Sequence, residues 1–133
     1  MHSSCATDTA AYVFGGGDKE DSYFNTVERL ALEDELDSDG NALPNEWTIF
    51  ELPNVLPRAN PLMAKLKKST ILILGGYNDG SGGEFSDGVI FDTNARQVTS
   101  TICGSDFRFM CWQNQHCVTE YGKVVALITD PED

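Results

Sequence analysis

The sequence of 133 residues predicts an all-β fold that is assembled from repeated sheets. A short apolar run that ends in two glycines occurs at Ala11–Gly16 and returns, sixty positions later, at Thr70–Gly76. A second β-type run follows each copy, at Phe24–Leu30 and at Phe85–Asp92. Because one repeat cannot bury its hydrophobic face alone, such a duplication predicts units that stack on one another.

The strands are expected where apolar or β-branched residues alternate, or run together, between turn residues. The glycines at 15–17 end the first strand, and the polar stretch Glu33–Asn45 is expected to form a long hairpin loop. Prolines at positions 53, 57 and 61 belong in a connection, where they cannot interrupt a ladder. The expected strands are Ala11–Phe14, Val27–Leu32, Trp47–Leu52, Pro61–Lys68, Ile71–Leu74, Val89–Asp92 and Val98–Ile102, followed by a hairpin of Cys117–Tyr121 and Lys123–Ile128.

The charge of the chain argues against two classes of partner. The formal net charge is −12, and acidic residues concentrate between positions 18 and 39. Nucleic acids and anionic membrane surfaces both require basic patches, so we expect neither as a partner. The longest apolar runs, at 71–74 and 124–128, are far too short to cross a bilayer. The N-terminus lacks the features of a signal peptide, and we expect a cytoplasmic protein with reduced thiols.

Two groups of residues have the composition of a metal site but not its spacing. The residue types of zinc ligands occur at Cys103, Cys111, His116 and Cys117, but their intervals fit no common zinc site, and buried structural thiols are expected instead. The segment Asp37–Asn41 has calcium-loop residues, but strand-type flanks and a proline at 44 favour a polar hairpin insertion. Motifs for phosphate binding and nucleophilic catalysis are missing. We therefore expect no cofactor, no metal and no enzyme activity.

Taken together, the duplicated segments resemble the kelch repeat. In that pattern an apolar strand ends in Gly-Gly, and a later strand with a tryptophan leads into a Leu-Pro connection. The matching positions are Gly15, Gly16, Val27–Arg29, Trp47, Leu52, Pro53, Pro57, Arg58, Gly75, Gly76, Phe91 and Asp92. The resemblance covers roughly residues 8–102 and implies kelch-type β-propeller blades of four antiparallel strands.

The resemblance also implies how the chain divides into units. We expect an incomplete first blade at 1–52, a second blade at 53–103 and the start of a degenerate third blade at 104–133. Kelch units have about 50 residues, so the insertion at 33–45 accounts for the longer interval. The second unit lacks a matching tryptophan, and the third lacks the glycine pair. Because propellers close with about 4–8 blades, an incomplete, open propeller fragment is expected, its edges covered by further blades or by self-association.

Each hallmark of the repeat has a physical role in such a propeller. Glycine at a strand end permits positive φ and a close approach of neighbouring backbones. Trp47 is expected to bury its large ring between adjacent sheets. Arg58 is expected to pair with an acid or with carbonyl groups at strand ends.

The function that the resemblance implies is protein binding, as a substrate adaptor or a cytoskeletal or scaffold adaptor. We expect a basic or mixed protein partner on the loops Gly17–Tyr23, Asn78–Phe85 and Pro53–Asn60. The candidate partner-binding residues are Asp18, Glu20, Asp21, Arg58, Tyr77, Asn78 and Asp79. The alternative is a non-catalytic propeller fragment of a larger enzyme, such as an oxidase-like kelch protein, whose catalytic residues lie outside these 133.

Overall fold

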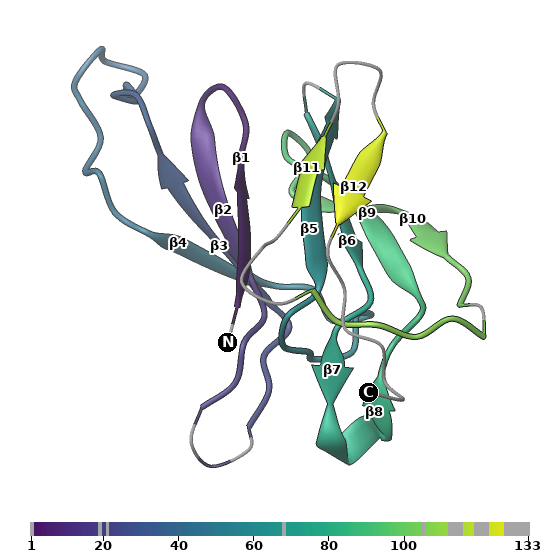
Figure 1. Cartoon of the computed structure of the whole chain (residues 1–133). Helices are drawn as coiled ribbons and strands as arrows, with labels where there is room; N and C mark the ends of the chain where they lie inside the picture. Colours follow the sequence, from purple (N-terminus) through teal and green to yellow (C-terminus); the bar gives the residue numbers. More distant parts are fainter. Residues whose placement is uncertain are drawn as a thin grey trace.

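Two four-stranded antiparallel sheets and a two-stranded hairpin make up an all-β fold, and neither large sheet closes on itself (Figure 1). The computed structural model describes residues 2–18, 20, 22–67, 69–104, 106–111, 116–118 and 123–126, with the backbone alone at 116–118. Residues 119–122 and 127–133 therefore lie outside the description, and with them the second part of the expected strand at 117–121 and the end of the expected strand at 123–128.

The first sheet has the strand order β1-β2-β3-β4. Its strands are β1 (Ser3–Ala6), β2 (Ala10–Phe14), β3 (Thr26–Ala31) and β4 (Thr48–Glu51). Three of them coincide with expected strands to within one residue at each end. The long hairpin expected at 33–45 joins β3 to β4, and a bridge pairs Leu36 with Ala42 inside it.

The second sheet repeats this arrangement with the order β10-β9-β6-β5. Its strands are β5 (Leu62–Lys67), β6 (Thr70–Leu74), β9 (Gly88–Asp92) and β10 (Gln97–Ile102). A small hairpin of β7 (Tyr77–Asn78) and β8 (Gly83–Glu84), with the 3-10 turn η1 (Asp79–Ser81) at its tip, interrupts the connection from β6 to β9. The final hairpin pairs β11 (His116–Val118) with β12 (Val124–Ala126).

The strand β1 was not expected from the sequence, and it completes the first unit. Ser3, Ser4, Cys5 and Ala6 are small and have weak strand preference. They are extended because they pair along the whole of β2, from Ser3 opposite Phe14 to Ala6 opposite Ala11. The first sheet therefore has four strands, as the second sheet does.

The main core lies between the two sheets. Tyr12 and Phe50 of the first sheet meet Phe91 of the second, with ring centroids 6.3 Å and 5.7 Å apart. The other buried members of this cluster are Ala10, Phe14, Val27, Leu52, Val55, Met63, Ile71, Ile73 and Val89. Burial of so many aromatic and branched side chains is the main force holding the sheets together.

A second cluster covers the opposite face of the second sheet. Leu62 and Leu72 pack there with Phe109 and Cys111 of the following segment. Partly buried members of the cluster include Val124 of β12, so the final hairpin lies over this face. The second sheet is therefore covered on both sides.

The duplicated strands β2 and β6 point their side chains in corresponding directions. With the glycine pairs aligned, Phe14 corresponds to Leu74, and each packs toward the unit that follows it in the chain. Val13 corresponds to Ile73, which is buried against the first sheet. The units thus stack in one consistent direction, and the first strands of both sheets, β1 and β5, lie side by side (Figure 1).

The expectation that Trp47 is buried between sheets was wrong. Its side chain is 48 % exposed, and Ile49 two residues later is 62 % exposed. Both positions face away from the core, because the alternate residue Phe50 is the one that packs on Phe91. Trp47 consequently lies on the uncovered face of the first sheet. This face corresponds to the face of the second sheet that packs against the first sheet through Ile73 and Phe91.

Candidate functional site

The two glycine pairs shape one end of the molecule. Gly15 and Gly75 both have φ of 70°, and the following residues, Gly16 and Gly76, have 107° and 105°. This is the left-handed region, which side chains disfavour. The chain therefore leaves β2 and β6 through the same turn, as the duplication predicts.

Backbone hydrogen bonds tie each glycine pair to the next segment of the chain. The N–H of Gly16 donates to Arg58 O at 3.0 Å, and the N–H of Gly76 donates to Phe109 O at 2.8 Å. Arg58 lies in the connection that leads into the second sheet, and Phe109 lies in the segment that follows the second sheet. The glycine pair is thus a joint between units, where a Cβ would collide with the neighbouring backbone.

The loop after each glycine pair projects from the same end. In the first unit, a bridge between Gly17 and Tyr23 closes the loop, and Asp18 Oδ1 accepts hydrogen bonds from the N–H groups of Glu20 and Ser22 at 2.8 Å and 3.0 Å. In the second unit the β7–β8 hairpin takes this place (Figure 1). The expected loops at 17–23 and 78–85 therefore share one end of the sheets.

Two tyrosines bring these loops into contact. The rings of Tyr23 and Tyr77 meet edge to face with centroids 6.3 Å apart. The Tyr77 hydroxyl donates to Asp79, and this bond, with the nearby carboxylate charge, raises the pKa of Tyr77 to about 12. Tyr23 was not among the candidate residues, although a tyrosine beside a glycine-rich acidic loop is a usual interface residue.

Carboxylates dominate the surface around the tyrosine pair. Asp18 and Glu20 stand on the first loop, and Asp79 and Glu84 on the β7–β8 hairpin. Arg108 approaches the hairpin, its guanidinium donating to Glu84 O at 3.5 Å. We call the four acidic residues Asp18, Glu20, Asp79 and Glu84, together with Tyr23 and Tyr77, the acidic loop surface. Asp21, another candidate, lies outside the described residues.

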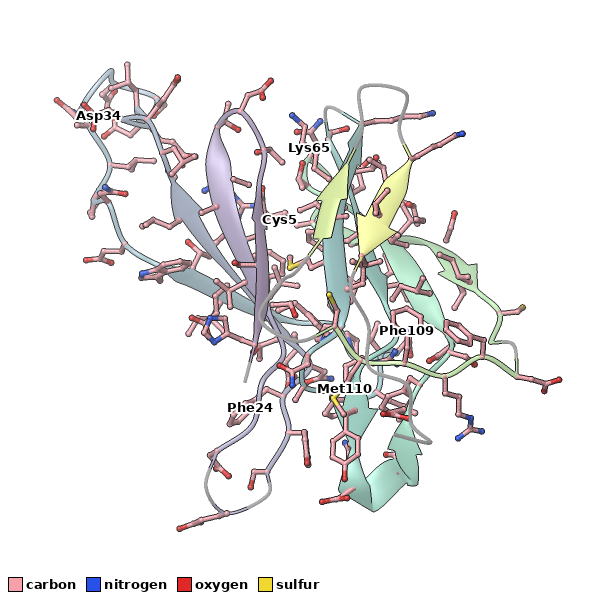
Figure 2. All side chains as sticks on the ribbon, in the orientation of Figure 1. Cys5, Phe24, Asp34, Lys65, Phe109 and Met110 are labelled. Carbon is pink, nitrogen blue, oxygen red and sulfur yellow. The ribbon has the colours of Figure 1, made fainter. Side chains whose placement is uncertain are left out.

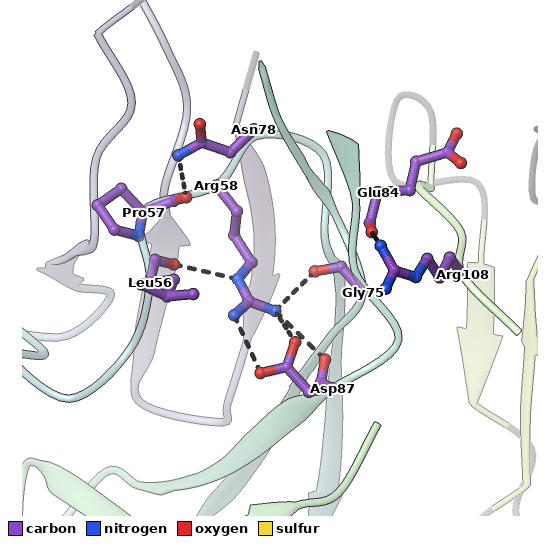
Figure 3. Close-up of polar contacts among 8 residues, drawn as sticks. All are labelled: Leu56, Pro57, Arg58, Gly75, Asn78, Glu84, Asp87 and Arg108. Atoms are coloured by element: carbon purple, nitrogen blue, oxygen red, sulfur yellow. Dashed lines mark hydrogen bonds and ion pairs between the residues drawn. The ribbon is translucent and has the colours of Figure 1, made fainter. Parts of the chain in front are cut away.

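Arg58, by contrast, lies in the interior and not on this surface. It is 2 % exposed, and its guanidinium donates to Leu56 O, Gly75 O and the carboxylate of Asp87 (Figure 3). The guanidinium carbon Cζ also lies over the Phe85 ring, 4.1 Å from its centroid. The role expected for Arg58 in pairing with an acid and with carbonyl groups matches these contacts, but its burial leaves it no access to a partner.

Asn78 is likewise enclosed, at 8 % exposure. Its side-chain amide donates to Pro57 O at 2.7 Å and so ties the β7–β8 hairpin to the third expected loop (Figure 3). That loop, 53–60, is partly internal: Val55, Ala59 and Asn60 are buried, whereas Leu56 is 53 % exposed. Arg58 and Asn78 are therefore enclosed, whereas Pro53, Asn54 and Leu56 of the third loop are exposed.

The described residues provide no metal site. In the part of the chain that the structure describes, no group of three or more histidine, cysteine or acidic side chains could hold a metal ion. Asp37 instead accepts hydrogen bonds from the backbone N–H groups of Asn41 and Asp39 at the tip of a polar hairpin. These hydrogen bonds hold the pKa of Asp37 below its usual value. Among the cysteines, Cys111 is buried but Cys103 is exposed, so the expectation of buried thiols fails at Cys103.

A scan against protein-family models found no match, and no curated protein matches the sequence significantly. Within the described residues, no helix is long and apolar enough to span a membrane.

Proposed function

We propose that this chain is part of a kelch-type β-propeller that works as a protein-interaction module. Support comes from its two four-stranded sheets, which stack in one direction with their first strands side by side. The equal φ angles at Gly15 and Gly75, and the repeated joint to Arg58 and Phe109, further support two units of one repeat.

In this proposal the uncovered face of the first sheet is the open end of the stack. Leu32, Trp47 and Ile49 are exposed there or at its border. The corresponding face of the second sheet is buried against the first, through residues such as Ile73 and Phe91. Exposed apolar surface of this kind favours association, so further units or another copy would cover it.

The binding surface in the proposal is the acidic loop surface. The contact between Tyr23 and Tyr77 is the observation that carries it, because this contact joins loops of two successive units into one surface. Tyrosines supply rigid contact area, and the surrounding carboxylates select a partner by charge. The partner is a protein with a basic or mixed face, bound with salt-dependent affinity.

The test compares two variants that remove the same charge at opposite ends of the molecule. Asp18→Asn with Glu20→Gln neutralises the acidic loop surface and keeps a side-chain oxygen at position 18 that can cap the same turn. Glu33→Gln with Asp34→Asn is the matched control, on the loop end far from Phe24 and Met110 (Figure 2). Partner proteins captured from the native source are quantified by mass spectrometry at two salt concentrations.

Capture of one basic partner is expected to fall at least about threefold in the loop-surface variant and to persist in the control. Raising the salt concentration is expected to weaken capture by the native chain and to narrow the difference in capture between the native chain and the loop-surface variant. Equal capture by both variants would reject the acidic loop surface as the binding site.

A further inference from the structure

Arg58 fills a defined place against the glycine pair of the second unit. Its guanidinium lies over Phe85 and donates to Gly75 O and to the Asp87 carboxylate, both at 3.0 Å. Its aliphatic stem passes over Gly76, where the side-chain Cδ lies 3.1 Å from the position that a Cβ would take. An arginine side chain is therefore the natural complement of this glycine joint.

The first unit has the same backbone arrangement as the residues that surround the Arg58 side chain in the second unit. Phe24 N–H donates to Gly16 O at 3.0 Å, as Phe85 N–H donates to Gly76 O at 2.8 Å. Gly15 N–H donates to Thr26 O, as Gly75 N–H donates to Asp87 O. Phe24 thus corresponds to Phe85, and Thr26 corresponds to Asp87.

In the first unit the corresponding place is an open pocket of about 390 Å³. It lies on the uncovered face of the first sheet, at the glycine end. Among the residues that line it are Val13, Gly15, Gly16, Phe24, Glu28 and Trp47. Phe24 and Trp47 are 42 % and 48 % exposed, so both rings are accessible to a ligand.

Glu28 supplies the carboxylate that Thr26 lacks. It lies two residues after Thr26 on the same strand, and so on the same face of the sheet. Its cross-strand neighbours are Val13 and Ile49, and it forms no ion pair with any residue that the structure describes. An acid between apolar neighbours, beside two accessible rings, is suited to a cation with an apolar stem.

The arginines of this chain are engaged elsewhere. Arg29 pairs with Glu35, Arg58 fills its own place, and Arg108 contacts Glu84. Arg96 lines a different pocket, beside Asp34 and Glu46 at the opposite end of the first sheet. An arginine for the first unit must come from outside the described residues.

We propose that the pocket formed by Phe24, Glu28, Trp47 and the Gly15–Gly16 turn binds an arginine side chain presented by another polypeptide segment. The guanidinium stacks on Phe24, donates to Gly15 O and pairs with Glu28, while Trp47 covers its apolar stem. This site is separate from the acidic loop surface, and it lies on the face of the first sheet that the stacking proposed above would cover.

The test is a titration of the whole chain with N-acetyl-arginine amide, followed by two-dimensional NMR. The reporters are the backbone amides of Gly16 and Phe24 and the Trp47 indole N–H, the last assigned from a Trp47→Phe variant. We expect saturable shifts at these three reporters. N-acetyl-citrulline amide, which has the same shape without the charge, is expected to leave them unmoved.

Glu28→Gln is expected to weaken binding at least about fivefold, because the charged hydrogen bond is lost. Glu51→Gln is the matched control, an exposed acid on the same face of the first sheet but outside the pocket, and it is expected to bind like the native chain. Thermal unfolding of both variants checks that the fold is retained. The proposal is overturned by equal binding of the arginine and citrulline amides, by full retention of binding in Glu28→Gln, or by shifts confined to residues 18–23 and 77–84.

Discussion

The buried guanidinium of Arg58 lies 3.0 Å from the carboxylate of Asp87, whose own side chain is 42 % exposed. One partner of this ion pair is therefore inside the protein, and the other is at its surface. The pair also fixes the connection between the two sheets, because Arg58 bonds to Gly75 O and Leu56 O as well.

Asp87→Asn is expected to lower the free energy of unfolding by about 1–3 kcal/mol, because it leaves a buried cation with neutral acceptors only. Asp8→Asn is the control, since Lys65 and Asp8 form an ion pair of the same length in an exposed position. That change is expected to cost less than about 1 kcal/mol. Urea unfolding of both variants measures the difference, and equal losses would contradict a special role for the buried pair.

Gly15→Ala is expected to destabilise the chain by more than about 3 kcal/mol. The new methyl group would meet the carbonyl of Arg58 and would also occupy a positive φ. Gly40→Ala separates these two effects, because Gly40 has φ of 81° with nothing within 4 Å of its Cβ position. We expect a loss of only about 1 kcal/mol there, and a thermal melt of each variant provides the comparison.

Phe14→Ala is expected to cost about 3–5 kcal/mol, because Phe14 is fully buried between the sheets. Trp47→Ala is expected to change stability by less than about 1 kcal/mol in the isolated chain, since the ring is half exposed. Chemical unfolding of the two variants measures both values. A large loss at Trp47 would mean that its face is covered in solution, as it would be by self-association.

Cys5 is expected to resist alkylation in the folded chain, because burial raises its pKa to about 12 and keeps it protonated. Its ordinary value is 9.0, so the preference for the protonated thiol stabilises the fold below about pH 9 and is lost as the pH rises toward 12. Iodoacetamide labelling at pH 8, read by peptide mass spectrometry, is expected to modify the exposed Cys103 first. A Cys5→Ala variant is expected to lose less stability than the native chain above pH 9, and an identical loss would contradict this assignment.

The sequence was a good guide to strands and to the repeated turn, and a poorer guide to side-chain exposure. The strand at β6 and the turn at Gly75–Gly76 follow from local properties, namely β-branched residues and positive φ. The strand β1 was missed because Ser3–Ala6 carries little local preference and is extended only through pairing with β2.

The sequence was also a good guide to some of the candidate binding residues and a poor guide to others. Asp18, Glu20 and Asp79 were identified from their position in acidic or glycine-rich loops, and such loops lie at the surface. Arg58 and Asn78 were placed with them, because position in a loop does not reveal that a side chain turns inward to Gly75 O or Pro57 O. Asp87 and Tyr23 were missed, since each acquires its role from a residue distant in the sequence.

The sequence alone thus determined the all-β class, the two units and the turns at their glycine pairs, because alternation, strand preference and backbone freedom are local properties. The tertiary structure decided which face of each sheet is covered, where Arg58 and Trp47 point and which loops meet at the acidic surface. These features depend on packing between segments that are distant in the sequence, such as Arg58 with Asp87 and Tyr23 with Tyr77, and side-chain direction there is set by the neighbouring sheet and not by the local sequence.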